Sequence, residues 1–334
     1  METRQGPSEP TIIRRLQRGI APAYALLAGM QLELFTALAA GPATAADVAA
    51  RLGVREDKLA PLLYALVLTE LITLADGRFA NSPEADQYLV RGRRRYLGGV
   101  HELWSDMWHA NLSTAQSIRL GAPQAKHDFA AGDTEELTKF LRGLSVVALP
   151  RGRRLAQEFD FSRCRSVVDV GGGSGFMLLG LCDHNPQLRG TLFDLPPITA
   201  IAQTLLRGAE HADRITIEPG DIVAAPPSGR HDAAICVQFV QVLSPAQAAV
   251  AIRHMCAAVE PGGTVYIVGT GILDNSRLAP EAAVFVGLSF LNVYDDGHAY
   301  TQEQYFGWLT AAGCVEPQRR TLEDQTGIIW ARKA

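Results

Sequence analysis

One stretch of the chain constrains its fold more than any other, the run Ser-Val-Val-Asp-Val-Gly-Gly-Gly-Ser-Gly at residues 166–175. Val167, Val168 and Val170 are β-branched apolar residues that suit the centre of a parallel sheet. The glycines that follow permit a tight bend at which a ligand can approach bare backbone. We expect a helix over residues 176–181, whose free N–H groups face the same space. The run therefore predicts a buried strand, a glycine turn and a helix.

The class of ligand follows from the strands that come next. A strand at residues 191–193 ends in Asp194, whose carboxylate can accept hydrogen bonds from ribose hydroxyls. A strand at residues 215–218 is followed by Gly-Asp, which places Asp221 where an acid can meet an adenine amino group. The dinucleotide fingerprint needs Gly or Ala where Phe176 stands, which disfavours a pyrophosphate site. The pattern favours S-adenosylmethionine (SAM) over NAD.

Composition describes a globular protein with no bulk affinity for polyanions. The 334 residues, 47% of them hydrophobic, suffice for two domains with ample core. A net charge of −4 argues against nucleic-acid or anionic-membrane partners. Five cysteines lie scattered without pairing or metal spacing, which indicates reduced core residues. The N-terminus shows no signal-peptide pattern and no apolar run reaches membrane-spanning length, so we expect a cytoplasmic protein.

The first part of the chain is typical of a winged helix. Residues 20–40 are apolar nearly all round, as in a helix that is buried on several faces and that one chain alone does not cover. Thr44 and Asp47 form a capping box that opens a short helix, and Gly53 ends it. Asp76-Gly77 is a hairpin turn between two short strands. The expected elements are helices at 45–52 and 57–70 and strands at 72–75 and 78–81.

Two functions suit a winged helix. Reading DNA, as in a ligand-sensing transcriptional regulator, requires basic and amide side chains on the second helix. Here that helix offers Lys58 among apolar residues. We therefore favour a domain that forms a dimer and covers a substrate cavity.

An aromatic-rich helical stretch follows at residues 96–120. Trp104, Met107 and Trp108 are spaced three or four apart on one face, which suits either ordinary helix packing or the wall of an apolar substrate cavity. A further helix at 137–159, which contains Phe140 and Leu144, then leads into the glycine-rich strand.

The C-terminal half alternates strands with helices, which predicts a doubly wound, Rossmann-like α/β fold. Strands are expected near residues 166–170, 190–193, 215–218, 233–237, 264–269 and 326–331. Three domains result: a winged-helix dimerisation domain at 1–95, a helical connector lining the substrate cavity at 96–160, and a SAM-binding catalytic domain at 161–334.

In their order, these motifs resemble those of the class I SAM-dependent O-methyltransferases, a family that includes plant caffeate, hydroxyindole and bacterial polyketide-tailoring enzymes. The resemblance covers the whole chain. It implies methylation of a small aromatic or conjugated metabolite in secondary metabolism, by a homodimer joined through its N-terminal domain. Its marks are the glycine run at 168–175, Phe-Asp-Leu-Pro at 193–196, Gly-Asp-Ile at 220–222, and the segments 300–305 and 308–313.

The resemblance also implies site residues. Gly171 and Gly173 are expected beside the methionine part of SAM, Asp194 at the ribose, and Asp221 with Ile222 around the adenine. The whole set expected to bind the cofactor is Asp169, Gly171, Gly173, Gly175, Asp194, Leu195, Asp221, Ile222 and Val237. The set expected to line the substrate cavity is Trp104, Trp108, Phe140, Leu144, Phe285, Phe290 and Asn292.

The chain departs from the family at the catalytic base. Relatives carry His-Asp-Trp after the fourth strand, and that histidine deprotonates a phenol. Alignment of the following helix places Gln241-Val242-Leu243 on the triplet, and Thr270 and Ala299 on the two acids that orient the histidine. The usual base is therefore predicted to be absent.

Substitutes for that base are sought in the segment 291–298. There His298 can act as a base and Tyr294 can donate or accept a hydrogen bond, while Gln241 orients the acceptor. Alternatively, residues 295–298 form a solvated turn. Asp295 and His298 are compatible with metal ligands, but no third ligand stands at a recognisable spacing, so no metal is predicted.

Two reaction classes stay open. Methyl transfer depends on holding nucleophile and methyl group in line, so C-, N- and O-methylation all tolerate the loss of a base. The alternative is a non-methylating reaction, such as a cyclisation or decarboxylation, in which the sulfonium is a fixed positive charge.

Overall fold

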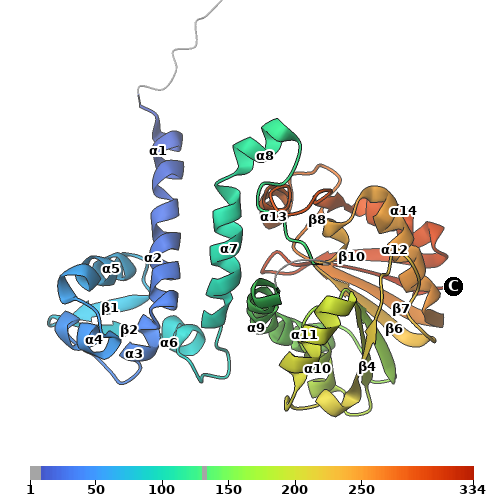
Figure 1. Ribbon diagram of the computed structural model, residues 1–334, viewed down its shortest axis with the longest axis horizontal. Helices are drawn as coiled ribbons and strands as arrows, with labels where there is room; N and C mark the ends of the chain where they lie inside the picture. Colours follow the sequence, from blue (N-terminus) through green and yellow to red (C-terminus); the bar gives the residue numbers. More distant parts are fainter. Residues whose placement is uncertain (1–8, 130–133) are drawn as a thin grey trace, which may run out of the picture. The chain divides into compact units, whose positions relative to one another are not determined.

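A computed structural model describes residues 9–129 and 134–334. The chain divides into two compact units, Met1–Ser105 and Asp106–Ala334 (Figure 1). The division falls within the segment predicted as a connector, and the three predicted domain boundaries stay a prediction. Over the described ranges, none of the helices has both the length and the apolar character needed to cross a membrane.

The first unit contains the predicted winged-helix elements. Thr44 Oγ1 accepts from the Asp47 N–H at 3.2 Å while Asp47 Oδ2 accepts from the Thr44 N–H at 3.1 Å, so the capping box forms as expected. Gly53 ends that helix in the left-handed conformation, with φ 66°. The elements are α1 Thr11–Arg18, α2 Ile20–Gln31, α3 Leu34–Leu38, α4 Ala45–Leu52, α5 Glu56–Leu68, β1 Ile72–Ala75, β2 Arg78–Asn81, α6 Pro83–Leu89 and the 3-10 turn η1 Gly98–Val100.

The prediction of one helix over residues 20–40 is wrong, because the helix breaks between α2 and α3. Glu33 adopts φ 57°, which no α-helix continues, and its carboxylate pairs with Arg91. The reversal lets α3 bury Leu34, Phe35 and Leu38 in the core of this unit.

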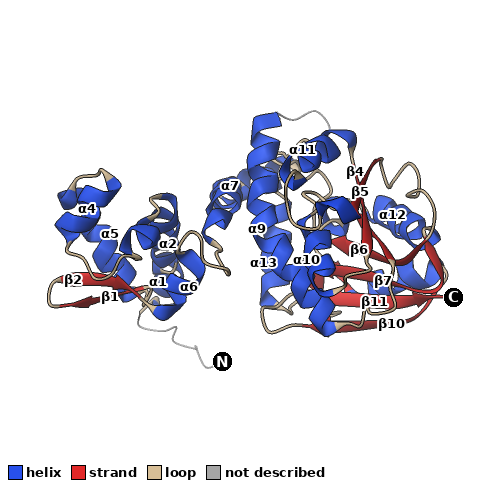
Figure 2. Ribbon diagram, turned by 90° about the horizontal axis from the view of Figure 1, so that it is seen from below, coloured by secondary structure: helices blue, strands red, loops and turns tan. Residues whose placement is uncertain are grey.

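The helical stretch expected at 96–120 consists of two helices, α7 His101–Asn111 and α8. Helix α7 crosses the division between the units. The second unit is an α/β domain, as predicted, and its main sheet has seven strands, one more than the six expected (Figure 2). Its helices are α8 Thr114–Leu120, α9 Thr134–Glu158, α10 Phe176–His184, α11 Pro196–Leu206, α12 Pro245–Ala257, α13 Glu281–Phe290 and α14 Gln302–Ala311. Its strands are β3 Ser166–Val170, β4 Arg189–Asp194, β5 Ile215–Pro219, β6 His231–Val237, β7 Val259–Gly269, β8 Ile272–Leu273, β9 Tyr300–Thr301, β10 Cys314–Thr321 and β11 Gly327–Lys333.

The order of strands in the sheet locates a ligand crevice. The order is β10-β11-β7-β6-β3-β4-β5, with β7, β6, β3, β4 and β5 parallel and β11 and β10 antiparallel. From β3 the chain winds outward to β5 and then returns to β6 on the other side of β3. In open α/β sheets, ligands bind at the carboxyl ends of the strands beside such a reversal. The sequence prediction missed strand β10, because this strand lies at the sheet edge and its less exposed residues alternate with exposed polar and charged residues.

Helices cover both faces of the sheet, and adjacent residues of one strand point into different layers. Val167 packs with side chains of α9, α10 and α11, whereas Val168 packs with those of α12 and α14. This alternation explains why β3 is apolar on both faces, since neither face meets water.

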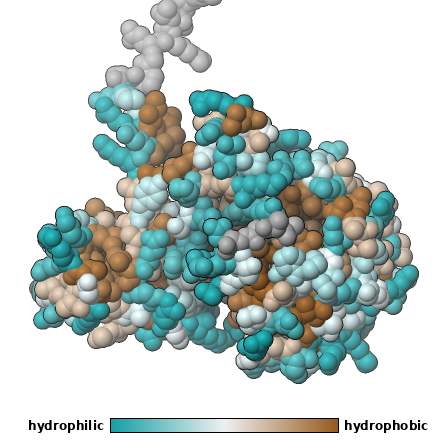
Figure 3. Space-filling model, viewed as in Figure 1, coloured by the Kyte–Doolittle hydropathy of each residue, from teal (hydrophilic) through white to brown (hydrophobic). Residues whose placement is uncertain are grey.

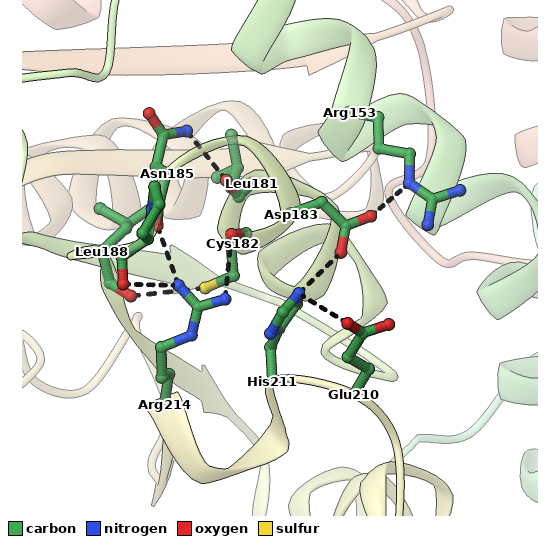
Figure 4. Close-up of polar contacts among 10 residues, drawn as sticks. Arg153, Leu181, Cys182, Asp183, Asn185, Leu188, Glu210, His211 and Arg214 are labelled. Atoms are coloured by element: carbon green, nitrogen blue, oxygen red, sulfur yellow. Dashed lines mark hydrogen bonds and ion pairs between the residues drawn. The ribbon is translucent and has the colours of Figure 1, made fainter.

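Polar contacts fix the end of α10 that lies away from the crevice (Figure 4). Arg214 donates to the carbonyls of Cys182, Asn185 and Pro186 at 2.9–3.0 Å, which satisfies the free carbonyls at the helix end. The Asp183 carboxylate pairs with Arg153 of α9 and, at 3.2 Å, with His211. These contacts connect α9, α10 and the loop before β5. They thereby hold α10, which begins directly after the glycine turn, in place.

Candidate functional site

The glycine turn after β3 is held in a conformation that suits glycine. Gly171, Gly173 and Gly175 have φ values of 67°, 55° and 79°. A Cβ at Gly171 would lie 2.5 Å from the Phe239 ring, and one at Gly175 would lie 3.0 Å from two leucine side chains. Larger residues are excluded at these positions by both backbone strain and contact. The turn thus brings bare backbone to the crevice.

Asp194 ends β4 beside this turn. Its carboxylate accepts the Gly173 N–H at 2.8 Å and the Leu195 N–H at 2.7 Å. Burial raises the pKa of this carboxyl to about 6, although the two hydrogen bonds oppose the shift. The group can therefore change its charge near neutral pH when a ligand arrives.

Asp169 lies one strand over, on β3, and is fully buried. Both of its carboxylate oxygens lack a hydrogen-bond partner among the described residues. Burial and the nearby Asp194 charge raise its pKa well above the usual range. A buried carboxyl group without partners is costly, so the pair calls for a ligand that brings hydroxyl or ammonium donors.

The other residues expected at the cofactor lie along the same edge of the sheet. Asp221 follows β5, is exposed, and accepts the Val223 N–H at 2.8 Å. Ile222 is 3% exposed, with its side chain in the core cluster. Val237 ends β6 next to Val268 of β7. Leu195 packs against the side chains of α9 and α11.

Two glutamines lie after β6, and sequence reasoning missed one of them. Gln238 has φ 53°, and its amide accepts the Thr270 N–H at 2.6 Å and donates to Thr270 Oγ1 at 2.7 Å. Gln241 is 1% exposed, and neither polar atom of its side chain has a partner in the described chain. The signal that could have found this residue is the run Gly-Thr-Gly at 269–271. A Cβ at Gly269 or Gly271 would lie within 3.0 Å of the two glutamine amides, so glycine suits both positions.

His298 and Asp295 do not form a common site. The exposed His298 ring packs 4.3 Å, between centroids, from the Tyr300 ring, and its backbone N–H donates to the Gln241 carbonyl at 3.1 Å. Asp295 forms an ion pair with Lys126 at 2.6 Å. Over residues 9–129 and 134–334, no group of three or more His, Cys, Asp or Glu side chains is placed to hold a metal ion.

Tyr294 belongs to a cluster of aromatic rings that the sequence prediction contained only in part. His127 is at the centre, with ring centroids 5.0 Å from Phe140, 5.8 Å from Tyr294 and 5.9 Å from Phe129. Phe290 lies 5.2 Å from Tyr294. Burial raises the pKa of the Tyr294 phenol above its usual value, so the hydroxyl keeps its proton. His127 and Phe129 were missed because they lie in a loop without a recognisable motif.

The remaining residues expected at the substrate fall into different environments. Leu144 packs in the same cluster as Phe140, whereas Phe285 is 58% exposed. Asn292 is fully buried and donates to Thr114 Oγ1 at 3.0 Å and to Asn111 Oδ1 at 3.3 Å, which ties α13 to α7 and α8. Trp104 and Trp108, one in each unit, are partly buried along α7.

Comparison with known proteins decides the family. Residues 116–315 match the model of the O-methyltransferase domain, and residues 15–91 match that of the O-methyltransferase dimerisation domain. The chain belongs to the O-methyltransferase family. It is a SAM-dependent methyltransferase, and the N-terminal winged helix is the dimerisation domain of this family.

Similar proteins come from bacterial natural-product pathways and from animals. The 3-hydroxy-5-methyl-1-naphthoate 3-O-methyltransferase of Streptomyces sahachiroi is 32% identical over 97% of this chain and 96% of that protein. The tetracenomycin polyketide synthesis 8-O-methyl transferase TcmO of Streptomyces glaucescens is 27% identical over 98% and 97%. The crystal structure of human N-acetylserotonin methyltransferase with SAM shares the fold, with TM-score 0.84, 22% identity and coverage of 99% and 100%.

Proposed function

We propose that this methyltransferase transfers the methyl group of SAM to a hydroxyl group on a small aromatic or conjugated metabolite of secondary metabolism. The observation that carries this proposal is a partly buried aromatic cluster that packs continuously up to the glycine turn. Phe140 faces His127 in this cluster, and the next residue, Leu141, has a methyl carbon 3.5 Å from the place of a Cβ on Gly173. An aromatic acceptor in the cluster would thus lie next to the cofactor turn. The hydroxyl acceptors named for the relatives support the choice of oxygen.

The chemistry of the polar groups fits SAM. Asp194 would accept the ribose hydroxyls, and Asp169, which has no partner among the described residues, would receive a donor from the methionine ammonium side. At Gly173, where the nearest side-chain atom would lie 3.5 Å from an added Cβ, the turn leaves room for a ligand against the backbone. Asp221, Ile222, Leu195 and Val237 would frame the adenine. When bound, the cofactor supplies a methyl group on a positively charged sulfur.

On the acceptor side, the chain contributes orientation. Gln241 offers a donor and an acceptor that are buried and without partners in the described chain, so it can hold a polar group of the substrate at the edge of the crevice. Tyr294 keeps its proton and can donate. Phe140, Leu144 and Phe290 would enclose the ring. Positioning of this kind contributes much of the rate of a displacement reaction.

A homodimer through the first unit is part of the proposal. Ile12, Ile13 and Leu16 on α1 are 66–68% exposed, while its arginines occupy the opposite side of the helix. Figure 3 shows these hydrophobic residues gathered along one side of α1. An apolar stripe of this length on a dimerisation domain is suited to a second copy of the chain.

The test is product analysis with SAM carrying an isotopic label in its methyl group. The purified protein is incubated with hydroxynaphthoates, hydroxybenzoates and polycyclic phenols, and the products are examined by mass spectrometry and NMR. Label on a phenolic oxygen, with one S-adenosylhomocysteine formed per product, is expected. Label on carbon or nitrogen, or turnover without consumption of SAM, would contradict O-methylation and identify the alternative reaction.

A further inference from the structure

His127 combines three properties that the proposed reaction needs. Its Nε2 lies 2.8 Å from Asp106 Oδ2, so the ring has a carboxylate partner. Its Nδ1 is buried and has no hydrogen-bond partner among the described residues. When the Nε2–H of His127 donates a hydrogen bond to Asp106, Nδ1 carries a lone pair that is available to accept a proton. A histidine held by a carboxylate on one nitrogen and open on the other is the arrangement of a general base.

The surroundings of His127 place that open nitrogen among the rings expected to hold the acceptor. Phe129, Phe140 and Tyr294 all meet the imidazole edge-on, with interplanar angles of 71–87°. Phe129 and Phe140 pack in one cluster with Leu195, which follows Asp194. The histidine is therefore joined to the cofactor edge of the sheet through continuous packing within one unit.

The backbone fixes the position of the histidine. The His127 N–H donates to the Val293 carbonyl at 2.9 Å, and the Ala125 N–H donates to the Asn292 carbonyl at 3.0 Å. Between them, Lys126 pairs with Asp295. The loop that carries His127 is thus attached at three points to the segment that follows α13, and the ring needs no rearrangement to face Tyr294.

We propose that His127, positioned by Asp106, accepts the proton of the phenolic hydroxyl in methyl transfer. This inference rests on the proposed function. The phenol O–H bond breaks and its proton moves to Nδ1 of His127 while the oxygen forms a bond to the methyl carbon. The S–CH₃ bond breaks, its electron pair stays on sulfur, and the neutral thioether leaves. Gln241, at the position of the family histidine, orients the substrate and takes no proton.

Several charged and titratable groups lie near His127. Asp106 of α7 pairs with Nε2 of His127, and burial raises the pKa of the Tyr294 phenol, which stays neutral. Lys126 and Asp295 neutralise each other nearby, and Asp128 adjoins His127 in the chain.

The first experiment compares His127→Asn with the wild type on phenols of different acidity. For an ordinary phenol, kcat/KM is expected to fall on the order of 10²–10⁴-fold in the variant. For a nitrophenol that is already ionised at pH 7, the loss should shrink to less than about tenfold, because no proton remains to be removed. Equal losses on both phenols would contradict the proposal. His298→Asn is the matched control, and a large loss in that variant on the ordinary phenol but not on the nitrophenol would assign the base to His298 instead.

A second measurement needs no turnover. The absorbance of a hydroxynaphthoate bound together with S-adenosylhomocysteine reports whether the bound phenol is ionised. In the wild type, the bound phenol should ionise at a pH at least one unit lower than in His127→Asn, since the imidazole accepts its proton. Asp106→Asn should lie between them, because it weakens the contact that positions the imidazole. Identical titrations in all three proteins would overturn the proposal.

The proposed function and the proposed role of His127 can be tested separately. If the wild type methylates no phenol, the proposed function fails. If it does methylate a phenol and His127→Asn keeps both the pH profile and the bound-phenol titration, the role of His127 alone fails. His127→Phe, which extends the surrounding aromatic packing, separates loss of the base from loss of fold, since it should retain binding of S-adenosylhomocysteine.

Discussion

The backbone N–H of Gly173 donates to the Asp194 carboxylate over 2.8 Å, so the glycine turn after β3 is joined directly to the acidic end of β4. Asp169 lies buried beneath the same turn, where a Cβ on Gly172 would lie 3.1 Å from its Oδ2. The edge of the sheet at which we propose that the cofactor binds thus contains two carboxyl groups with raised pKa values. We therefore expect the affinity for a ligand at this edge to depend on pH.

Affinity for S-adenosylhomocysteine should fall as the pH is lowered below about 6, the pKa of Asp194. Ribose hydroxyls donate to the ionised carboxylate, so binding favours the charged form. Below the pKa of the free protein, binding must release a proton, and the Kd should rise by about tenfold for each pH unit. Above it, the Kd should be flat. Isothermal titration calorimetry between pH 5 and 8 measures this.

Asp194→Asn is the variant that isolates this effect. It should bind S-adenosylhomocysteine more weakly at pH 8 and show a shallower pH dependence. The exposed Asp213→Asn serves as the control and should behave like the wild type. A wild-type Kd that does not change between pH 5 and 8 would contradict the role of Asp194 at the ribose. The carboxyl of Asp169 can add a second proton to the profile, since its pKa is also raised.

Gln241→Met keeps the size of a buried side chain but removes its amide. We expect kcat/KM for a phenolic acceptor to fall about 10- to 100-fold, equivalent to about 1.4–2.7 kcal/mol of transition-state stabilisation. Binding of S-adenosylhomocysteine and the melting temperature should change little, because the amide has no protein partner in the described chain to lose. Steady-state kinetics with differential scanning fluorimetry measures both. An unchanged kcat/KM would remove Gln241 from the acceptor site.

Arg214→Ala should destabilise the second unit. Arg214 is partly buried and donates to three carbonyls at the end of α10. Loss of these charge-assisted hydrogen bonds is expected to cost about 1–3 kcal/mol of unfolding free energy. Urea denaturation followed by circular dichroism measures it. Arg207→Ala, at an exposed position, is the control, and an equal effect of both changes would show that the carbonyl contacts contribute nothing.

Ile13→Glu together with Leu16→Glu should convert the protein to a monomer. Both side chains lie on the apolar side of α1 and are 68% and 66% exposed in the isolated chain. Two buried charges would oppose any interface that covers them. Sedimentation velocity should give a dimer for the wild type and for Arg18→Glu on the opposite side of the helix. A double variant that sediments as the wild type would place the dimer interface elsewhere.

Signals within short stretches of sequence predicted much of the fold. The valines and glycines of residues 166–175 specify a buried strand and a sharp turn by their own conformational preferences. Thr44 with Asp47, and Asp76 with Gly77, set a helix start and a hairpin in the same way. Each of these features depends on contacts between neighbours in the chain, so the residue types alone define it.

The same reasoning failed where distant contacts decide the structure. The apolar pattern over residues 20–40 does not reveal the left-handed Glu33, which Arg91 holds from another segment. The sequence of edge strand β10 shows only a weak alternation of apolar and polar residues, and its pairing with β11 stabilises it as a strand.

The sequence by itself predicted the glycine turn and indicated the family and the cofactor, because each motif that carries them is a short run of neighbouring residues. Only the tertiary structure decided which polar groups from distant parts of the chain meet, and which are buried. It gave His127 the Asp106 carboxylate, paired Asp295 with Lys126, and left the Gln241 amide buried without a partner in the described chain. Such relations depend on how loops and helices from separate parts of the chain pack together, and no local preference of a residue encodes them.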